Sequence, residues 1–215
     1  NSLPPPEALV AEEQRAGYLA MKAMTEADPR PMAVIKDLTC PGPAGAIPVR
    51  FYDVRESRDP SPVILFFHGG GFVIGDLDTH DVLCRELANG SNCAIVAVDY
   101  RMAPEHPFPA AVIDCLAAAR WVHRHASSLG LDASRLAIGG DSAGGNLSAV
   151  VSILARDEGD LPIRFQLLIY PGTDMRCTSA SHRSARPACG WRVRCCSWTR
   201  MPGSARPKRV ARLRV

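Results

Sequence analysis

Long apolar runs are absent from this chain of 215 residues. No stretch approaches the run of about 20 apolar residues that a helix needs to span a bilayer, so we expect no membrane span. Residues 1–6 show no basic segment followed by an apolar one, so we also expect no signal peptide. No CxxC pair occurs among the eight cysteines, which leaves zinc and thioredoxin-like sites without support. A reducing cytoplasm is therefore the expected location.

The overall composition is that of an ordinary globular protein, with 47% hydrophobic and 22% charged residues. The length suits one domain with a sizeable core. Four cysteines, Cys40, Cys84, Cys93 and Cys115, lie in apolar or helical stretches. We expect them to be small buried hydrophobic side chains.

Acidic residues are missing from residues 181–215, which carry nine Arg and one Lys. Residues 1–180 carry 15 basic and 22 acidic side chains, so the net charge of +3 combines −7 in the first part with +10 in the second. Two explanations stay open. One is a basic arm that binds nucleic acid or anionic lipid. The other, which we favour, is a shifted reading frame, because reading residues 195–199 one nucleotide earlier permits Leu-Leu-Leu-Val-Asp; we therefore expect no nucleic-acid partner.

Strand-like and helix-like segments alternate up to about residue 170. Apolar runs typical of buried strands occur at residues 62–67, 93–98, 135–139 and 165–170. Helical spacing occurs at residues 7–24, 80–89, 108–125 and 144–156, and two further strands are indicated at 33–37 and 47–54. Strands that alternate with helices of ten or more residues indicate parallel crossovers. We therefore predict an α/β fold, a mostly parallel sheet with flanking helices.

A glycine-flanked serine lies directly between a predicted strand and a predicted helix, in Gly140-Asp141-Ser142-Ala143-Gly144. Such a tight turn exposes and orients the hydroxyl, and small residues on both sides let the strand and the helix pass closely. The first N–H groups of the helix point toward negative charge that develops during attack. The pattern predicts that Ser142 is a nucleophile. For this motif alone, the alternative is a glycine-rich turn without function.

Consecutive glycines follow another predicted buried strand, in His68-Gly69-Gly70-Gly71-Phe72. Glycines let the backbone approach a ligand with unblocked N–H donors. An acyl-transfer enzyme needs such donors about 3 Å from the oxyanion of the tetrahedral intermediate. We expect His68 to be structural rather than catalytic, because it precedes the turn.

Together these motifs resemble those of the hormone-sensitive-lipase family of α/β-hydrolase carboxylesterases, in its bacterial branch. The matching stretches are residues 68–80, 99–110 and 140–146 and the Tyr-Pro pair at 170–171, all in family order. The resemblance implies an α/β-hydrolase fold, short- to medium-chain acyl esters as substrates, and no metal or organic cofactor. It also implies that Ser142 is the nucleophile and that the N–H groups of Gly70, Gly71 and Ala143, with Gly69, form the oxyanion hole.

A convincing acid and base for this serine are missing. In this fold the triad order along the chain is Ser, then Asp or Glu, then His. Downstream of Ser142, Asp174 and His182 are the only pair in that order with a plausible placement. They are eight residues apart, with no predicted strand or helix between them to position each one. We keep them as triad candidates but favour the alternative that they are polar residues without a catalytic role.

The resemblance implies an N-terminal cap region at residues 1–45 and a partial α/β-hydrolase core at 46–178, and the composition sets apart an atypical basic tail at 179–215. With the C-terminal part of the fold missing or altered, one edge of the sheet would be uncovered, which keeps a homo-oligomer open. Two functions stay open. The first is a serine carboxylesterase or lipase acting on a small-molecule ester. The second is a ligand-binding protein on a hydrolase scaffold that has lost catalysis, as in plant gibberellin receptors, which resemble the same family. We favour the first, because the matched motifs are unmodified.

Overall fold

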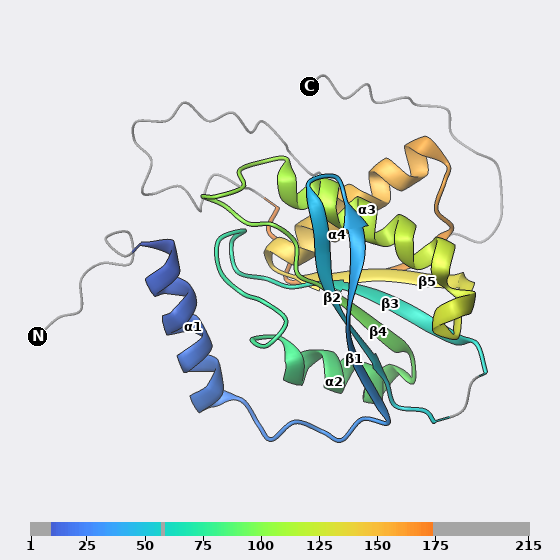
Figure 1. Cartoon of the computed structure of the whole chain (residues 1–215), viewed down its shortest axis with the longest axis horizontal. Coiled ribbons are helices and arrows are strands. Elements are labelled where there is room, and N and C mark those ends of the chain that lie inside the picture. The colour runs from blue at the N-terminus through green and yellow to red at the C-terminus, as the bar shows by residue number, and fades with distance from the viewer. Residues whose placement is uncertain (1–9, 57–58, 174–215) are drawn as a thin grey trace, which may run out of the picture.

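Helices and strands alternate along most of the chain in the computed structural model, which describes residues 10–56 and 59–173 (Figure 1). The helices are α1 (Ala11–Thr25), α2 (Asp81–Ser91), α3 (Ala110–His125) and α4 (Ala143–Glu158), with a 3-10 turn at Ser127–Leu129. The strands are β1 (Val34–Gly42), β2 (Gly45–Asp53), β3 (Ser61–Phe67), β4 (Ala94–Val98), β5 (Leu131–Asp141) and β6 (Ile163–Ile169). Each segment predicted from the sequence corresponds to one of these elements.

The strands of the described part form one sheet in the order β1-β2-β4-β3-β5-β6. β3 pairs in parallel with β4 and β5, and β5 pairs in parallel with β6. β1 and β2 form an antiparallel hairpin that joins β4. The predicted α/β fold with a mostly parallel sheet is therefore confirmed. Because β3 and β5 run in the same direction, their carboxyl ends meet at one edge of the sheet, where Phe67 lies opposite Gly140.

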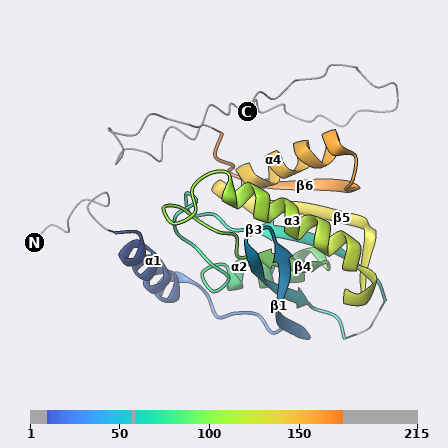
Figure 2. The ribbon, with the colours of Figure 1, turned by 45° about the horizontal axis from the view of Figure 1, so that its top comes forward.

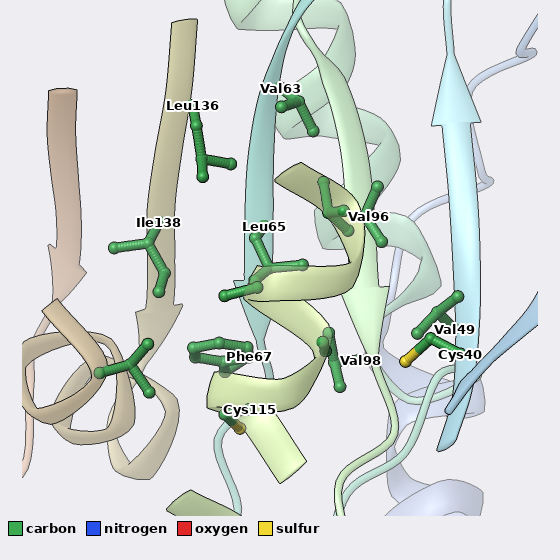
Figure 3. Packing of buried hydrophobic residues seen from close by; sticks show 14 of the residues in the cluster. Cys40, Val49, Val63, Leu65, Phe67, Val96, Val98, Cys115, Leu136 and Ile138 are labelled. Carbon is green, nitrogen blue, oxygen red and sulfur yellow. The ribbon is translucent and has the colours of Figure 1, made fainter. Parts of the chain in front are cut away.

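Helices cover both faces of this sheet (Figures 1 and 2). In β3, Leu65 and Phe67 belong to the cluster that packs against α3 and α4, whereas Ile64 and Phe66 belong to the cluster that packs against α2. Figure 3 shows Leu65 and Phe67 on the same side as Cys115 of α3. Burial of both faces explains why the central strand reads as a continuous apolar run. Phe67, the last residue of β3, is itself buried, so this packing holds in place the end of the strand from which the glycine loop begins.

The hairpin changes the division of the chain into parts. β1 lies within residues 1–45, which we expected to form a cap region, yet it pairs with β2 along its whole length, from Val34 with Asp53 to Gly42 with Gly45. The sheet therefore begins before residue 46. In contrast, α1 has no buried residue and lies beside the layers rather than within them (Figure 1).

Cysteine burial follows the expectation closely. Cys40, Cys84 and Cys115 are buried, and Cys93 is half-buried; all four are free thiols. Among residues 10–56 and 59–173, no helix is both long and apolar enough to cross a bilayer.

Candidate active site

Ser142 occupies a sharp turn between the last residue of β5 and the first residue of α4. Its backbone adopts φ 48° and ψ −112°, a region that residues other than glycine rarely adopt. The side chain is half-buried, and its hydroxyl makes no hydrogen bond to any described residue. A strained backbone that presents an unpaired hydroxyl is the geometry expected of a nucleophile elbow.

Both glycines of the elbow are required by close packing. A Cβ built on Gly140 would lie 2.3 Å from the carbonyl oxygen of Phe67, and one on Gly144 would lie only 1.8 Å from the same atom. The end of β3 therefore passes directly against the turn that carries Ser142. This is the physical reason for small residues on both sides of the serine.

Backbone hydrogen bonds hold the elbow from the side of β6. The Ser142 N–H donates to the carbonyl oxygen of Ile169 at 2.9 Å, and the Gly172 N–H donates to the carbonyl oxygen of Ser142 at 3.0 Å. The Asn146 side chain of α4 donates from Nδ2 to the carbonyl oxygen of Gly172 at 2.7 Å. The strained turn is thus fixed by hydrogen bonds to the end of β6 and to the segment that follows it.

The glycine loop follows β3 at the same edge of the sheet. Gly70 and Gly71 have φ values of +125° and +62°. A Cβ on Gly70 would lie 1.9 Å from the carbonyl oxygen of Ile74, so no other residue fits there. The N–H groups of Val73 and Ile74 both donate to the carbonyl oxygen of Gly70, which closes the turn.

Three backbone donors near the elbow are uncommitted. Within the described part of the chain, the N–H groups of Gly70, Gly71 and Ala143 donate no hydrogen bond. Ala143 opens α4, where the first N–H groups of a helix have no partner inside the helix. These groups are chemically able to bind an anionic oxygen beside the serine.

Gly69 differs from the other loop glycines, because its N–H donates to Oδ1 of Asp141 at 2.8 Å. We expected Gly69 to join the oxyanion donors, but this hydrogen bond occupies its only N–H. The expected set of donors is thereby reduced to Gly70, Gly71 and Ala143. A run of glycines in a sequence shows where the backbone is unobstructed, but not which N–H groups are already paired.

Two buried histidines lie behind the glycine loop. His68 is 3% exposed, stacks on the Tyr100 ring at 4.3 Å, and donates from Nδ1 to the carbonyl oxygen of Gly69 at 2.8 Å. Burial, together with the neighbouring His80, lowers the pKa of His68 to about 4, so its ring is neutral. His80 is also 3% exposed. His68 thus supports the loop, in line with the structural role expected of it, and no hydrogen bond joins it to Ser142.

The acid and base of a triad are not formed by the described residues. None of the five histidines in the described ranges hydrogen-bonds to Ser142. The two triad candidates, Asp174 and His182, lie outside the described residues. No group of three metal-ligating side chains is found among residues 10–56 and 59–173.

Helix α1 is attached to the rim of the glycine loop by one side chain. Arg15 donates from Nε to the carbonyl oxygen of Val73 at 2.7 Å, and from a guanidinium nitrogen to that of Ala103 at 3.0 Å. The same guanidinium forms a two-point ion pair with Glu105. Sequence reasoning missed Arg15, because nothing in a helical pattern distinguishes it from a solvated arginine.

Comparison with known proteins identifies relatives of this arrangement. A family model described as an alpha/beta hydrolase fold matches residues 64–201. Esterase LipI of Mycobacterium tuberculosis (strain ATCC 25618 / H37Rv) is 54% identical over 141 residues, covering 65% of this chain and 44% of that protein. Ethyl acetate hydrolase of Pseudomonas putida is 39% identical over 183 residues, covering 82% and 57%. The chain thus spans about half the length of these relatives.

Solved structures that resemble this chain include an alpha/beta hydrolase and an esterase. A serine-to-alanine mutant of LAE6, an alpha/beta hydrolase from the metagenome of Lake Arreo, superposes with a TM-score of 0.77 at 45% identity over 80% of this chain and 55% of that one. A hyperthermophilic esterase from Pyrobaculum calidifontis superposes with a TM-score of 0.74 at 41% identity, with the same coverage of both chains.

Proposed function

The chain belongs to the α/β-hydrolase fold family, in its hormone-sensitive-lipase-like group of carboxylesterases, and from this premise we propose that it attacks carboxylic esters with Ser142. The substrates we propose are small-molecule esters with short- to medium-chain acyl groups. One observation carries the assignment: the strained Ser142 lies at the edge of the sheet where three unpaired N–H groups also lie.

In the proposed reaction, Ser142 Oγ forms a bond to the carbonyl carbon of the ester, and the carbonyl oxygen becomes an oxyanion. The N–H groups of Gly70, Gly71 and Ala143 donate hydrogen bonds to that oxyanion. Each such donor is worth about 10²–10³-fold in rate. The proton that Ser142 Oγ loses passes to the leaving alkoxide oxygen, so the tetrahedral intermediate expels an alcohol. Water then hydrolyses the acyl-enzyme, which releases the acid and returns a proton to Ser142 Oγ. The chemistry requires no metal and no organic cofactor.

Helix α1 belongs, in this proposal, to a cap beside the acyl site. Its attachment through Arg15 to the carbonyl oxygens of Val73 and Ala103 supports this assignment, because these atoms belong to the glycine loop and the segment next to it. A cytoplasmic location is supported by the four free thiols of the described part.

A ligand-binding protein without turnover is the second candidate. It is favoured by the absence, among the described residues, of a histidine hydrogen-bonded to Ser142. With an elbow and oxyanion hole but no base, activity would fall by roughly 10³-fold or more. The pocket would then hold an ester or acid without cleaving it.

Two assays on the full chain separate these functions. One is hydrolysis of 4-nitrophenyl butyrate, and the other is covalent labelling by a fluorophosphonate, with the labelled residue located by peptide mass spectrometry. The variants are Ser142→Ala and, as a matched control, Ser128→Ala, whose exposed hydroxyl donates only to the His125 carbonyl oxygen. We expect hydrolysis and labelling to be lost in the first variant and unchanged in the second. Hydrolysis that survives Ser142→Ala contradicts the assignment, and an absence of both signals in the wild type favours the binding protein.

A further inference from the structure

A buried carboxylate joins the elbow to the glycine loop and has no part in the proposed reaction. Asp141 precedes the nucleophile, and the residue is 5% exposed. Its Oδ1 accepts the Gly69 N–H at 2.8 Å and lies 3.4 Å from Nε2 of His80. Its Oδ2 accepts the Tyr170 hydroxyl at 3.3 Å. Three donors from three separate segments therefore converge on one side chain.

His80 is itself held in a defined orientation. Its Nδ1 lies 3.1 Å from Oγ1 of Thr79, and the Thr79 N–H donates to Oδ1 of Asp76 at 2.7 Å. Because the carboxylate of Asp141 can only accept, the proton of the contact with Nε2 belongs to His80. His80 thus presents a donor to Asp141.

These donors keep Asp141 charged in spite of its burial. Burial alone would raise the pKa of the Asp141 carboxyl, but His80 and the Gly69 N–H outweigh burial and lower that pKa below its usual value. An ionised acceptor forms a shorter and stronger hydrogen bond with an N–H group than a neutral acceptor does. The bond to Gly69 is therefore of the strong kind.

The space around Gly69 shows how closely the two motifs fit. A Cβ on Gly69 would lie 2.2 Å from Oδ2 of Asp141, so the carboxylate lies directly against the backbone of the loop. The next two residues, Gly70 and Gly71, carry the unpaired N–H groups and have positive φ values that cost glycine little. A loop this free to change conformation needs an external contact to fix its first residue.

We propose that Asp141 is a positioning residue of the oxyanion hole: its carboxylate holds the Gly69 N–H, and thereby aims the N–H groups of Gly70 and Gly71 at the oxygen bound beside Ser142. This inference rests on the proposed function and adds a residue that does not itself touch the substrate. Asp141 would control the orientation of the peptide groups of Gly70 and Gly71, which glycine residues do not fix by themselves.

Two readouts on the full chain test this role. The first is hydrogen exchange of the Gly69 amide and the amide chemical shifts of Gly70 and Gly71, measured by NMR. The second is the affinity for butylboronic acid, whose tetrahedral adduct with a serine is seen by boron NMR and places an anionic oxygen in the hole. The variants are Asp141→Ala and Asp141→Asn. The matched control is Asp53→Asn, a 7% exposed carboxylate that binds Arg55 at the opposite end of the sheet.

With Asp141→Ala, we expect the Gly69 amide to lose its protection, the Gly70 and Gly71 signals to shift, and boronate affinity to fall by about 100-fold. Asp141→Asn keeps an oxygen acceptor and should retain affinity within about tenfold. Asp53→Asn should leave both readouts at the wild-type values, even where it lowers the unfolding midpoint. Should Asp141→Ala not fold, His80→Ala removes one of the donors that orient the carboxylate and should weaken boronate binding by about tenfold.

Two results overturn the positioning role. One is wild-type boronate affinity in Asp141→Ala, and the other is an equal loss in Asp53→Asn that follows stability. If the wild type forms no tetrahedral adduct, the proposed function fails at Ser142. In that event the NMR signals still decide: unchanged Gly69, Gly70 and Gly71 amides in Asp141→Ala refute the anchor, and changed amides support it.

Discussion

Replacing Gly144 by alanine should force the first turn of α4 away from the end of β3. A Cβ at this position would lie 1.8 Å from the Phe67 carbonyl oxygen and 2.7 Å from that of His68, whereas ordinary contact begins at 3.4 Å. Both obstructing atoms belong to the backbone, so no rotamer change relieves the clash. Overpacking costs roughly 1–3 kcal/mol and occasionally more, and we expect about 3 kcal/mol here.

Gly90→Ala is the matched control, because it makes the same chemical change inside another helix. A Cβ at Gly90 of α2 would have no heavy atom within 4 Å. Alanine is favoured over glycine in a helix interior by roughly 0.5–1 kcal/mol, and Gly90 is the next-to-last residue of α2, so only part of this gain applies and the variant should be slightly more stable than the wild type.

Thermal and urea unfolding, followed by circular dichroism, measure both effects. For a domain of this size 1 kcal/mol corresponds to about 2–4 °C, so Gly144→Ala should lower the midpoint by roughly 6–12 °C and Gly90→Ala should raise it slightly. Fluorophosphonate labelling of Ser142 should be slower in Gly144→Ala than in the wild type and unchanged in Gly90→Ala. A Gly144→Ala protein with the wild-type midpoint and labelling rate would refute the close packing of strand and helix at the elbow.

Three further outcomes follow from single side chains. Iodoacetamide at pH 8 should modify Cys93 at least about tenfold faster than Cys40 in the native protein, since burial raises the pKa of Cys40 to about 11; peptide mass spectrometry measures both rates. Arg15→Gln should speed proteolysis within α1, whereas Arg156→Gln, which removes an exposed ion pair, should not. Burial and neighbouring carboxylates raise the pKa of Asp99 to about 6, so its ionisation destabilises the folded state increasingly as the pH rises from about 4 to 6. The free energy of unfolding of Asp99→Asn, measured in urea, should therefore equal that of the wild type near pH 3 and exceed it by about 2 kcal/mol at pH 7.

The elbow and the glycine loop could be predicted because both are encoded locally. A buried strand, a tight turn and a helix succeed one another around Ser142, and the three consecutive glycines directly follow β3. The order of the strands could not be predicted in the same way. β1 has mostly exposed or half-buried side chains, so its apolar pattern gives no indication that it pairs with β2 along its whole length.

The bond between Asp141 and Gly69 was also beyond prediction, because its two residues are 72 positions apart. It depends on the register that places Phe67 opposite Gly140. Both motifs could be identified separately, and His80 even lies in a stretch that resembles the family. Nothing local, however, indicates that a carboxylate beside the nucleophile takes the first N–H of the glycine loop.

In the proposed reaction, described residues supply the N–H groups that bind the oxyanion, and no histidine of residues 10–56 and 59–173 hydrogen-bonds to Ser142. His68 and His80 are both 3% exposed and are committed to Gly69 and to Asp141, so neither can take the serine proton without dismantling the loop that it supports. Oxyanion binding and proton removal therefore depend on different residues and should respond separately. A protein with an intact oxyanion hole but no general base would bind the boronate with high affinity and hydrolyse esters slowly. Comparing boronate affinity with turnover of 4-nitrophenyl butyrate would consequently show which of the two functions this molecule performs.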